Sequence, residues 1–487
     1  MFFMQIKCCF DRIMQTQKGE IFMISKKQAI EILNAGLATG GDFCEIYIED
    51  KLSKTINVEN GKVDTSSIAQ TYGAGIRILK DLQSVYGYTN DVSFKSLKSL
   101  AESLSNSFSG KRVLTVESLK SKKVKNNSPI EKPLASVPVD EVIAYLKKGE
   151  KVMREHDSKI VRSRATIASS HQKVTLINSK GLIYNDEKER NRLALLAIAA
   201  DQGKIETAFE GPGAMAGFEY FEKKIDVEKL AKQVASTAVK FLYAKECPSG
   251  KMPVVIGNAF GGVLFHEACG HPLEATSVAK KLSVFADKLG EQIASPVVTA
   301  IDDGTIANEW GSNNIDDEGN PTEKNVLIKD GILKNYLIDD FNGRRMGMKG
   351  NGASRRQSYK FEPTSRMSNT YIDNGKSTPE EIIAATKLGL YAKSFAGGSV
   401  NPATGEFNFG CSEAYIIRDG KIAEPVRGAS LIGSGKEVLL NIDMVGNDLV
   451  LAQGMCGSVS GSIPVDVGQP TIRLKEITVG GNGGELK

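Results

Sequence analysis

Two histidines and a glutamate form a compact group near the middle of the sequence, within residues 264–274. The chain has four histidines in 487 residues, and His266 and His271 lie five positions apart with Glu267 directly after the first. Neutral imidazoles are zinc ligands, and an adjacent carboxylate can accept a proton from a metal-activated water. These residues therefore predict a zinc-dependent hydrolytic site, with His266 and His271 as ligands and Glu267 as the general base.

The spacing of the two histidines is one residue longer than in the familiar H-E-x-x-H motif. Residues four apart lie on one face of an α-helix, whereas residues five apart are separated by roughly 140°. We therefore predict that His266 and Glu267 are helical and that a π-bulge or a helix break follows between Cys269 and Pro272. Gly270 is a residue that suits a helix end.

A catalytic zinc site with two histidines still lacks one protein ligand. The candidates are nearby and distant donors: Cys269, Glu274, Cys44, Cys247, Cys411 and Cys456. Glycines on both sides of Cys456 would let the backbone approach an ion closely. Spacing alone does not decide between Glu274 and Cys456. The other histidines, His156 and His171, fall in a polar stretch and are expected at the surface.

The composition indicates a soluble globular protein. Hydrophobic residues make up 41% and charged residues 25% of the chain, and the net charge of +4 is too small to favour a nucleic-acid partner. Seven scattered cysteines suit a reducing compartment. Because no apolar run approaches the roughly 18 residues of a membrane span, we expect a cytoplasmic protein that does not bind membranes.

The periodicity predicts an α+β fold in two main parts. Residues 23–248 form an N-terminal mixed α/β region with a lysine-rich linker near 110–138, and residues 249–487 form a strand-rich C-terminal domain carrying the zinc-site helix. Charged residues interrupt the apolar start of residues 1–22, so this leader does not read as a signal peptide. We expect translation to begin at Met23.

Several elements are predicted from caps, turns and apolar spacing. Ser25 and Thr378 are helix caps, and Asn60-Gly61 is a hairpin turn. The predicted elements are helices at 25–37, 94–108, 140–156 and 227–241, and strands at 160–169, 174–177, 193–200 and 252–256.

The motif and several later blocks together resemble the TldD branch of the TldD/PmbA family of metalloproteases. The blocks are HEACGH (266–271), NIDDEG (314–319), STPEEII (377–383), MVGNDL (444–449), CG (456–457) and VGQPT (467–471). The likeness extends over about residues 23–481 and is strongest after residue 254. The chain departs from the pattern at Ser458, where a lysine is expected, and Cys269 places an additional thiol inside the motif.

The resemblance implies a zinc ion on His266, His271 and Cys456, with Glu267 as the general base. It also implies cleavage of unfolded or modified peptides inside a dimer cavity. The partner would be a second copy of the chain or a PmbA/TldE-like subunit that lacks the metal motif.

Two other functions remain open at this point. One is a peptide-binding or chaperone-like subunit with a structural zinc, and the other is a zinc amidase acting on small molecules. Four protein ligands would favour the first, and the shape of the cavity would distinguish the second. Arg355, Arg356 and Tyr359 are candidates for stabilising an oxyanion. The sequence does not identify the substrate.

Overall fold

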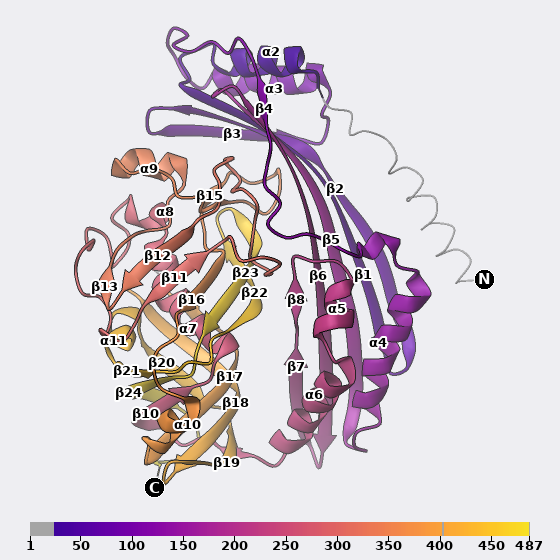
Figure 1. Ribbon diagram of the computed structural model, residues 1–487, viewed down its shortest axis with the longest axis vertical. Helices are drawn as coiled ribbons and strands as arrows, with labels where there is room; N and C mark the ends of the chain where they lie inside the picture. The colour runs from indigo at the N-terminus through magenta and orange to yellow at the C-terminus, as the bar shows by residue number, and fades with distance from the viewer. Residues whose placement is uncertain (1–23, 402–403, 487) are drawn as a thin grey trace. The chain divides into compact units, whose positions relative to one another are not determined.

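The computed structural model describes residues 24–401 and 404–486 (Figure 1). By the contacts between its residues, the chain divides into two compact units. The predicted leader and the start at Met23 lie outside the described residues. Among the described residues, the smaller unit contains 24–48, Gly73–Lys122 and Thr175–Tyr184, and the larger unit contains the others. The boundary falls within four long strands: β1 (Phe43–Glu59), β2 (Lys62–Lys80), β5 (Ile160–Asn178) and β6 (Leu182–Asp201).

The smaller unit packs two helices, α2 (Lys26–Gly36) and α3 (Phe94–Ser105), with the ends of long strands. As predicted, Ser25 caps α2: its side chain accepts a hydrogen bond from the backbone N–H of Gln28, whose side chain completes a capping box. The apolar faces of both helices bury leucine, isoleucine and alanine side chains in one core. This unit also contains β3 (Gln83–Thr89) and the short β4 (Lys120–Lys122).

The long strands form a sheet in the order β3-β2-β1-β5-β6-β4, to which β7 (Lys204–Glu210) and β8 (Gly213–Ala214) add on β6. The predicted hairpin is present, with positive φ angles at Asn60 and Gly61. The expectation of two strands at 160–169 and 174–177 is wrong, because β5 is continuous from Ile160 to Asn178. Its polar middle stays extended between β1 and β6, the two neighbours of β5 in the sheet.

In the larger unit, helices α4 (Val139–Arg154) and α6 (Val227–Phe241) pack against each other. They share a core with the end of β1, the first part of β5, the last part of β6 and β7. Gly149 permits the close approach, because a Cβ there would lie 2.6 Å from Cγ2 of Val227. Two short helical segments precede α6 along the chain, η2 (Leu134–Ser136) and α5 (Glu219–Lys224).

The C-terminal part of the larger unit contains two sheets and the largest apolar core. The first has the order β17-β10-β24-β20-β18-β19-β9, with β21 paired to β24, and the second has the order β13-β12-β11-β16-β23-β22. The strands of the first are β9 (Lys245–Glu246), β10 (Gly250–Ile256), β17 (Leu388–Val400), β18 (Glu406–Arg418), β19 (Lys421–Arg427), β20 (Ser430–Ser434), β21 (Ile442–Val445) and β24 (Ile472–Gly480). Those of the second are β11 (Ala300–Asp303), β12 (Lys324–Lys329), β13 (Ile332–Leu333), β16 (Asn369–Ile372), β22 (Val450–Ser458) and β23 (Gly461–Gln469). The short strands β14 (Ser354–Arg355) and β15 (Thr364–Ser365) pair separately. The α+β class is confirmed.

A chain of short helical segments follows β10 and contacts strands of both sheets. It consists of η3 (Ala259–Gly262), α7 (Val263–Phe265), η4 (His266–Gly270), η5 (His271–Leu273) and α8 (Ala275–Val278). The segment η4 contacts β16 of one sheet and β17 and β18 of the other, so the histidine motif is held between them. The other helices here are α9 (Asp340–Met346), α10 (Pro379–Ala384) and α11 (Gly435–Leu440). Across the described residues, the helices are too short or too polar to cross a membrane.

Candidate metal centre

The histidine motif adopts a π-helical turn. The turn comprises His266–Gly270, and the N–H of His271 donates to the carbonyl of His266, five residues earlier. A 3₁₀ turn at His271–Leu273 follows. The predicted irregularity is therefore confirmed, although it begins at His266 rather than at Cys269. The wider turn accommodates the extra residue and brings the imidazole centroids to 5.1 Å, with the rings nearly perpendicular at 83°.

Gly270 does not end the helix, contrary to the expectation from its type. Its backbone is right-handed, with φ −56° and ψ −56°, and the helical chain continues through it. Glycine is needed here for space, because a Cβ would collide with Sδ of the fully buried Met367. A second close approach occurs at Gly435, where a Cβ would collide with the carbonyl oxygen of Ala268 in the motif.

Cys456, on strand β22, lies beside the two motif histidines. Its Sγ lies 3.3 Å from Nε2 of His266 and 3.2 Å from Nε2 of His271, and the three atoms lie within 4.8 Å of one another. Zn–N bonds of about 2.0–2.1 Å and a Zn–S bond of about 2.3 Å in tetrahedral geometry separate nitrogen and sulfur by roughly 3.5 Å. The spacing of these atoms thus fits a shared ion.

The other sequence candidates do not join this group. Glu274 Oε1 lies 3.3 Å from Nδ1 of His271, whereas Nε2 of the same ring faces Cys456. Glu274 therefore contacts His271 from the side away from Cys456. Cys269 is fully buried in the apolar core, and burial raises the pKa of its thiol. Among the described residues, the His/Cys/Asp/Glu group that could hold a metal consists of His266, His271 and Cys456. His171 instead pairs with Glu187 at 2.6 Å.

The electrostatics of the three donors favour a thiolate. Burial alone would raise the pKa of Cys456, but the charges and hydrogen bonds of His266 and His271 lower it to about 4. Burial has the opposite tendency at His271, where it lowers the pKa, yet Glu274 and Cys456 raise that pKa well above its usual value. Without an ion, these shifts favour a thiolate at Cys456, the form of sulfur that binds metals, beside His271.

Two charged side chains surround the donors. Glu267 is partly exposed, and its Oε2 lies 3.9 Å from Nε2 of His271. Arg366 is fully buried, donates to the carbonyl of Cys456 at 2.6 Å, and places Nε 3.7 Å from Glu274. Arg366 thus links the cysteine strand to the carboxylate that holds His271. Sequence reasoning missed Arg366, because a single arginine in a polar stretch has no diagnostic spacing.

The three oxyanion candidates form other hydrogen bonds. Arg355 Nη1 donates to the carbonyl of Met367 at 2.7 Å, and Arg356 Nη2 donates to the carbonyl of Asp317 at 2.7 Å. The backbone N–H of Tyr359 donates to Glu49 at 2.8 Å. All three side chains are buried.

The fold and the converging donors define a class of metal-binding proteins in which one helical motif and one distant cysteine meet between two sheets. Models of the three domains of one metallopeptidase family match most of the chain. Residues 249–481 match the PmbA/TldA metallopeptidase C-terminal domain, 132–242 the central domain and 44–107 domain 1. The chain belongs to the PmbA/TldD family of metallopeptidases, as the sequence resemblance implied.

Individual relatives extend over nearly the whole chain. A metalloprotease TldD homologue of Haemophilus influenzae is 37% identical over 451 residues, covering 90% of this chain and 93% of its own. A TldD homologue of Buchnera aphidicola subsp. Acyrthosiphon pisum is 35% identical with the same coverage. The crystal structure of TldE from Thermococcus kodakarensis has a TM-score of 0.73 at 21% identity, covering 93% of this chain and 99% of its own. This last likeness establishes the fold.

Proposed function

We propose that this protein is a zinc-dependent peptidase that hydrolyses unfolded or modified peptides. The observation that supports this most strongly is the approach of Cys456 Sγ to within 3.3 Å of both motif histidines, with Glu267 beside them. Two imidazole nitrogens and a thiolate are a donor set that zinc prefers. When bound, zinc would polarise a substrate carbonyl and lower the pKa of water.

The number of ligands favours catalysis over a purely structural ion. Structural zinc sites are usually closed by four protein ligands, whereas catalytic sites have three and leave one position for water or substrate. In the described part of the chain, the group has three members, and both Glu274 and Cys269 lie outside it. This argues against the chaperone-like alternative with a structural zinc.

Glu267 is the proposed general base. It directly follows His266 on the π turn, and its partial exposure leaves the carboxylate accessible to water. In the proposed reaction, it accepts the proton of the attacking water and then donates it to the leaving amine. The C–N bond breaks as the new C–O bond becomes that of the product carboxylate.

A peptide substrate is supported by the position of β22. This strand carries Cys456 and lies at the end of its sheet, where it pairs, among the described strands, with β23 alone. The carbonyls of Gln453, Gly454 and Cys456 accept hydrogen bonds from side chains of other segments. Met455, Gly457 and Ser458 of the same strand are exposed. An extended peptide can pair with such an edge, whereas a small amide gains little from it.

The proposed peptidase acts as a homodimer or with a PmbA/TldE-like subunit that lacks the metal motif. The relationship to TldE supports the second arrangement. Measuring the mass of the chain in solution, alone and with a metal-free homologue from the same genome, would distinguish the two. A strictly monomeric chain that binds no homologue would contradict both. We retain residues 249–487 as the metalloprotease domain and the cytoplasm as the expected compartment.

The test of the proposed function is a peptidase assay on Glu267→Gln. Wild-type protein should cleave unstructured peptides, and a chelator should abolish cleavage until zinc is restored. The glutamine variant should keep zinc at wild-type stoichiometry and lose at least 10²-fold in rate. Glu291→Gln, which removes an exposed carboxylate paired with Lys288, is the matched control and should be fully active. Full activity of Glu267→Gln would overturn the assignment.

A further inference from the structure

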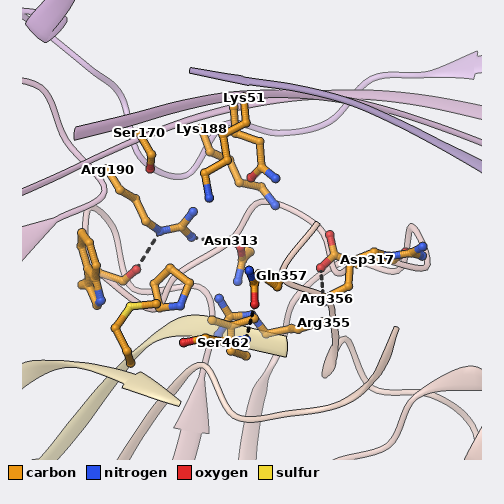
Figure 2. A pocket seen from close by; sticks show the side chains of 15 residues that line it. Lys51, Ser170, Lys188, Arg190, Asn313, Asp317, Arg355, Arg356, Gln357 and Ser462 are labelled. Atoms are coloured by element: carbon orange, nitrogen blue, oxygen red, sulfur yellow. Dashed lines mark hydrogen bonds between the residues drawn. The ribbon is translucent and has the colours of Figure 1, made fainter. Parts of the chain in front are cut away.

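The larger unit contains a cavity lined by cationic side chains. It lies next to strand β22, but its lining does not include His266, His271 or Cys456. The cavity has a volume of about 140 Å³. Strands β1, β5 and β6 line one side of it, and the segment around Arg355 and the β22–β23 hairpin line the other (Figure 2). Five cationic side chains contribute to its walls: Lys51, Lys188, Arg190, Arg355 and Arg356.

Four of the five cations are buried, and Lys51 is partly exposed. Lys188 and Arg190 are each 6% exposed and alternate along β6, so their side chains leave the same face of the strand. Figure 2 shows Lys51 and Lys188 extending from the strands toward the side of Arg190 and Asn313. Arg190 is fixed in place by donating to the carbonyls of Trp310 and Ser312 and to Asn313 Oδ1.

One carboxylate lines the cavity with the cations, and others lie behind its wall. Asp317 is the acidic residue of the wall, and its Oδ2 accepts the backbone N–H of Arg356 at 2.7 Å. Behind the wall, Asp186 lies 3.3 Å from Lys188, and Glu49 accepts hydrogen bonds from Tyr359 and Gln172. Asp302 also acts on Arg355 and Asp466 on Arg190. Among the residues that line the cavity, five are cationic and one, Asp317, is acidic.

Burial and nearby positive charge lower the pKa values of two of these cations. Burial, together with the nearby cations Arg190 and Arg366, lowers the pKa of Arg355 to about 9, despite Asp317 and Asp302. Burial and the neighbouring Arg190 lower the pKa of Lys51, an effect that Glu49 opposes. A bound anion would relieve both effects, because an opposite charge favours the cationic form.

The lining of the cavity does not include the three candidate metal ligands, although it includes Ile463, the cross-strand partner of Cys456. Met455 and Pro464 form a cross-strand pair that lines the cavity, whereas Cys456, the next residue, belongs to the buried core. Successive side chains of a strand point to opposite faces. The volume is below the roughly 300 Å³ of typical pockets for drug-sized ligands, so only a compact group fits.

We propose that this cavity binds a compact oxyanion, namely a carboxylate or a phosphate group. Lys51 and Lys188 would supply the charge, and the amide side chains of Asn313 and Gln357 supply polar surface beside them. Tetrahedral or planar oxyanions suit clustered lysine and arginine donors, which form short charge-assisted hydrogen bonds. The anion could be the carboxylate of a bound peptide or free phosphate, and the two sources share this chemistry.

The first experiment measures binding of inorganic phosphate to the zinc-loaded protein by calorimetry, at ionic strength held constant with chloride. Wild-type protein should bind phosphate at one site. Lys51→Gln should weaken that binding at least about tenfold, the loss expected for one charge-assisted hydrogen bond. Lys51→Arg should retain much of it. Lys204→Gln, which removes an exposed lysine at the start of β7, should match wild type.

The second experiment identifies the source of the anion by competition, without any need for activity. Fluorescent unstructured peptides with a free carboxyl terminus or a terminal amide are bound to the Glu267→Gln protein, and phosphate is added. Displacement of the free acid alone would place the substrate carboxylate in the cavity, and binding of phosphate without displacement would assign it to free phosphate. The proposal would be overturned if Lys51→Gln and Lys204→Gln bound phosphate and the free-acid peptide with equal affinity. It would also be overturned if the cavity bound neither phosphate nor the free-acid peptide. Since binding is measured, failure of the peptidase proposal would be seen separately.

Discussion

The carboxylate of Glu274 lies 3.3 Å from Nδ1 of His271, while Nε2 of the same ring lies 3.2 Å from Sγ of Cys456. The imidazole therefore has a fixed orientation, with one nitrogen toward an acid and the other toward the thiol. Arg366 extends this arrangement by contacting both Glu274 and the carbonyl of Cys456. A carboxylate behind a histidine ligand orients the ring and raises its basicity.

The first prediction concerns this carboxylate. Glu274→Gln should lower zinc affinity by about 10–100-fold, because the amide cannot supply the negative charge that holds Nδ1–H in place. Affinity is measured by competition with a chelator of known strength. Glu291→Gln is the matched control, since Glu291 is half exposed and pairs with Lys288. Unchanged zinc affinity in Glu274→Gln would show that Glu274 does not position His271.

The second prediction concerns the space at the π turn. In Gly270→Ala, the new methyl group meets Met367, so either the buried methionine or His271 must shift. The free energy of unfolding should fall by about 1–3 kcal/mol, the usual cost of overpacking, and zinc affinity should fall with it. Denaturant unfolding of the apoprotein and chelator competition measure the two effects.

Gly410→Ala serves as the control for this substitution, because a Cβ at Gly410 meets nothing within 4 Å. It should leave both quantities near wild type. If Gly270→Ala behaves like Gly410→Ala, the close packing of the turn has no role in placing the histidines.

The third prediction concerns pH. In the apoprotein, the pKa of Cys456 is lowered to about 4, whereas burial raises that of Cys247 to about 11 and that of Cys411 to about 12. Because the thiolate is the nucleophile, Cys456 should be alkylated at a nearly constant rate between about pH 5 and pH 8, and Cys247 and Cys411 slowly throughout. Mass spectrometry of alkylated peptides gives the rates.

The same shift has a defined effect on stability. The folded pKa of Cys456 is below the unfolded value near 8.5, so the thiolate favours folding fully above that value. This contribution is lost progressively as the pH falls to about 4. An alkylation rate for Cys456 that rises tenfold per pH unit up to pH 8 would contradict the assigned thiolate.

Local features were predicted well from the sequence. Ser25 and Thr378 cap their helices through capping boxes, since a cap depends only on residues within one turn. The long histidine spacing predicted an irregular helix for the same reason. By contrast, β5 was divided in two because its polar residues near His171 resemble a loop. Pairing with a strand on each side keeps that segment extended, and such pairing is set by the whole sheet.

The site was predicted only in part. The order of residue types identified His266, Glu267 and His271, but spacing left Glu274 and Cys456 as alternatives for the third ligand. In the structure Glu274 faces Nδ1 of His271 and Cys456 faces Nε2, an arrangement that depends on the tertiary fold. The basic cavity was not predicted, since Lys51 and Arg355 are far apart in the sequence. The available signal was the alternation of Asp186, Lys188 and Arg190 within one strand, a charged pattern in a mostly buried element.

The most direct test of the metal centre is replacement of zinc by cobalt(II) in wild-type protein and in Cys456→Ser. Cobalt bound to a thiolate gives a sulfur-to-metal charge-transfer absorption in the near ultraviolet, which serine cannot produce. We predict that wild type and Cys269→Ala show this absorption and that Cys456→Ser loses it. Persistence of the absorption in Cys456→Ser, or its loss in Cys269→Ala with the protein still folded and cobalt bound, would contradict a centre formed by His266, His271 and Cys456.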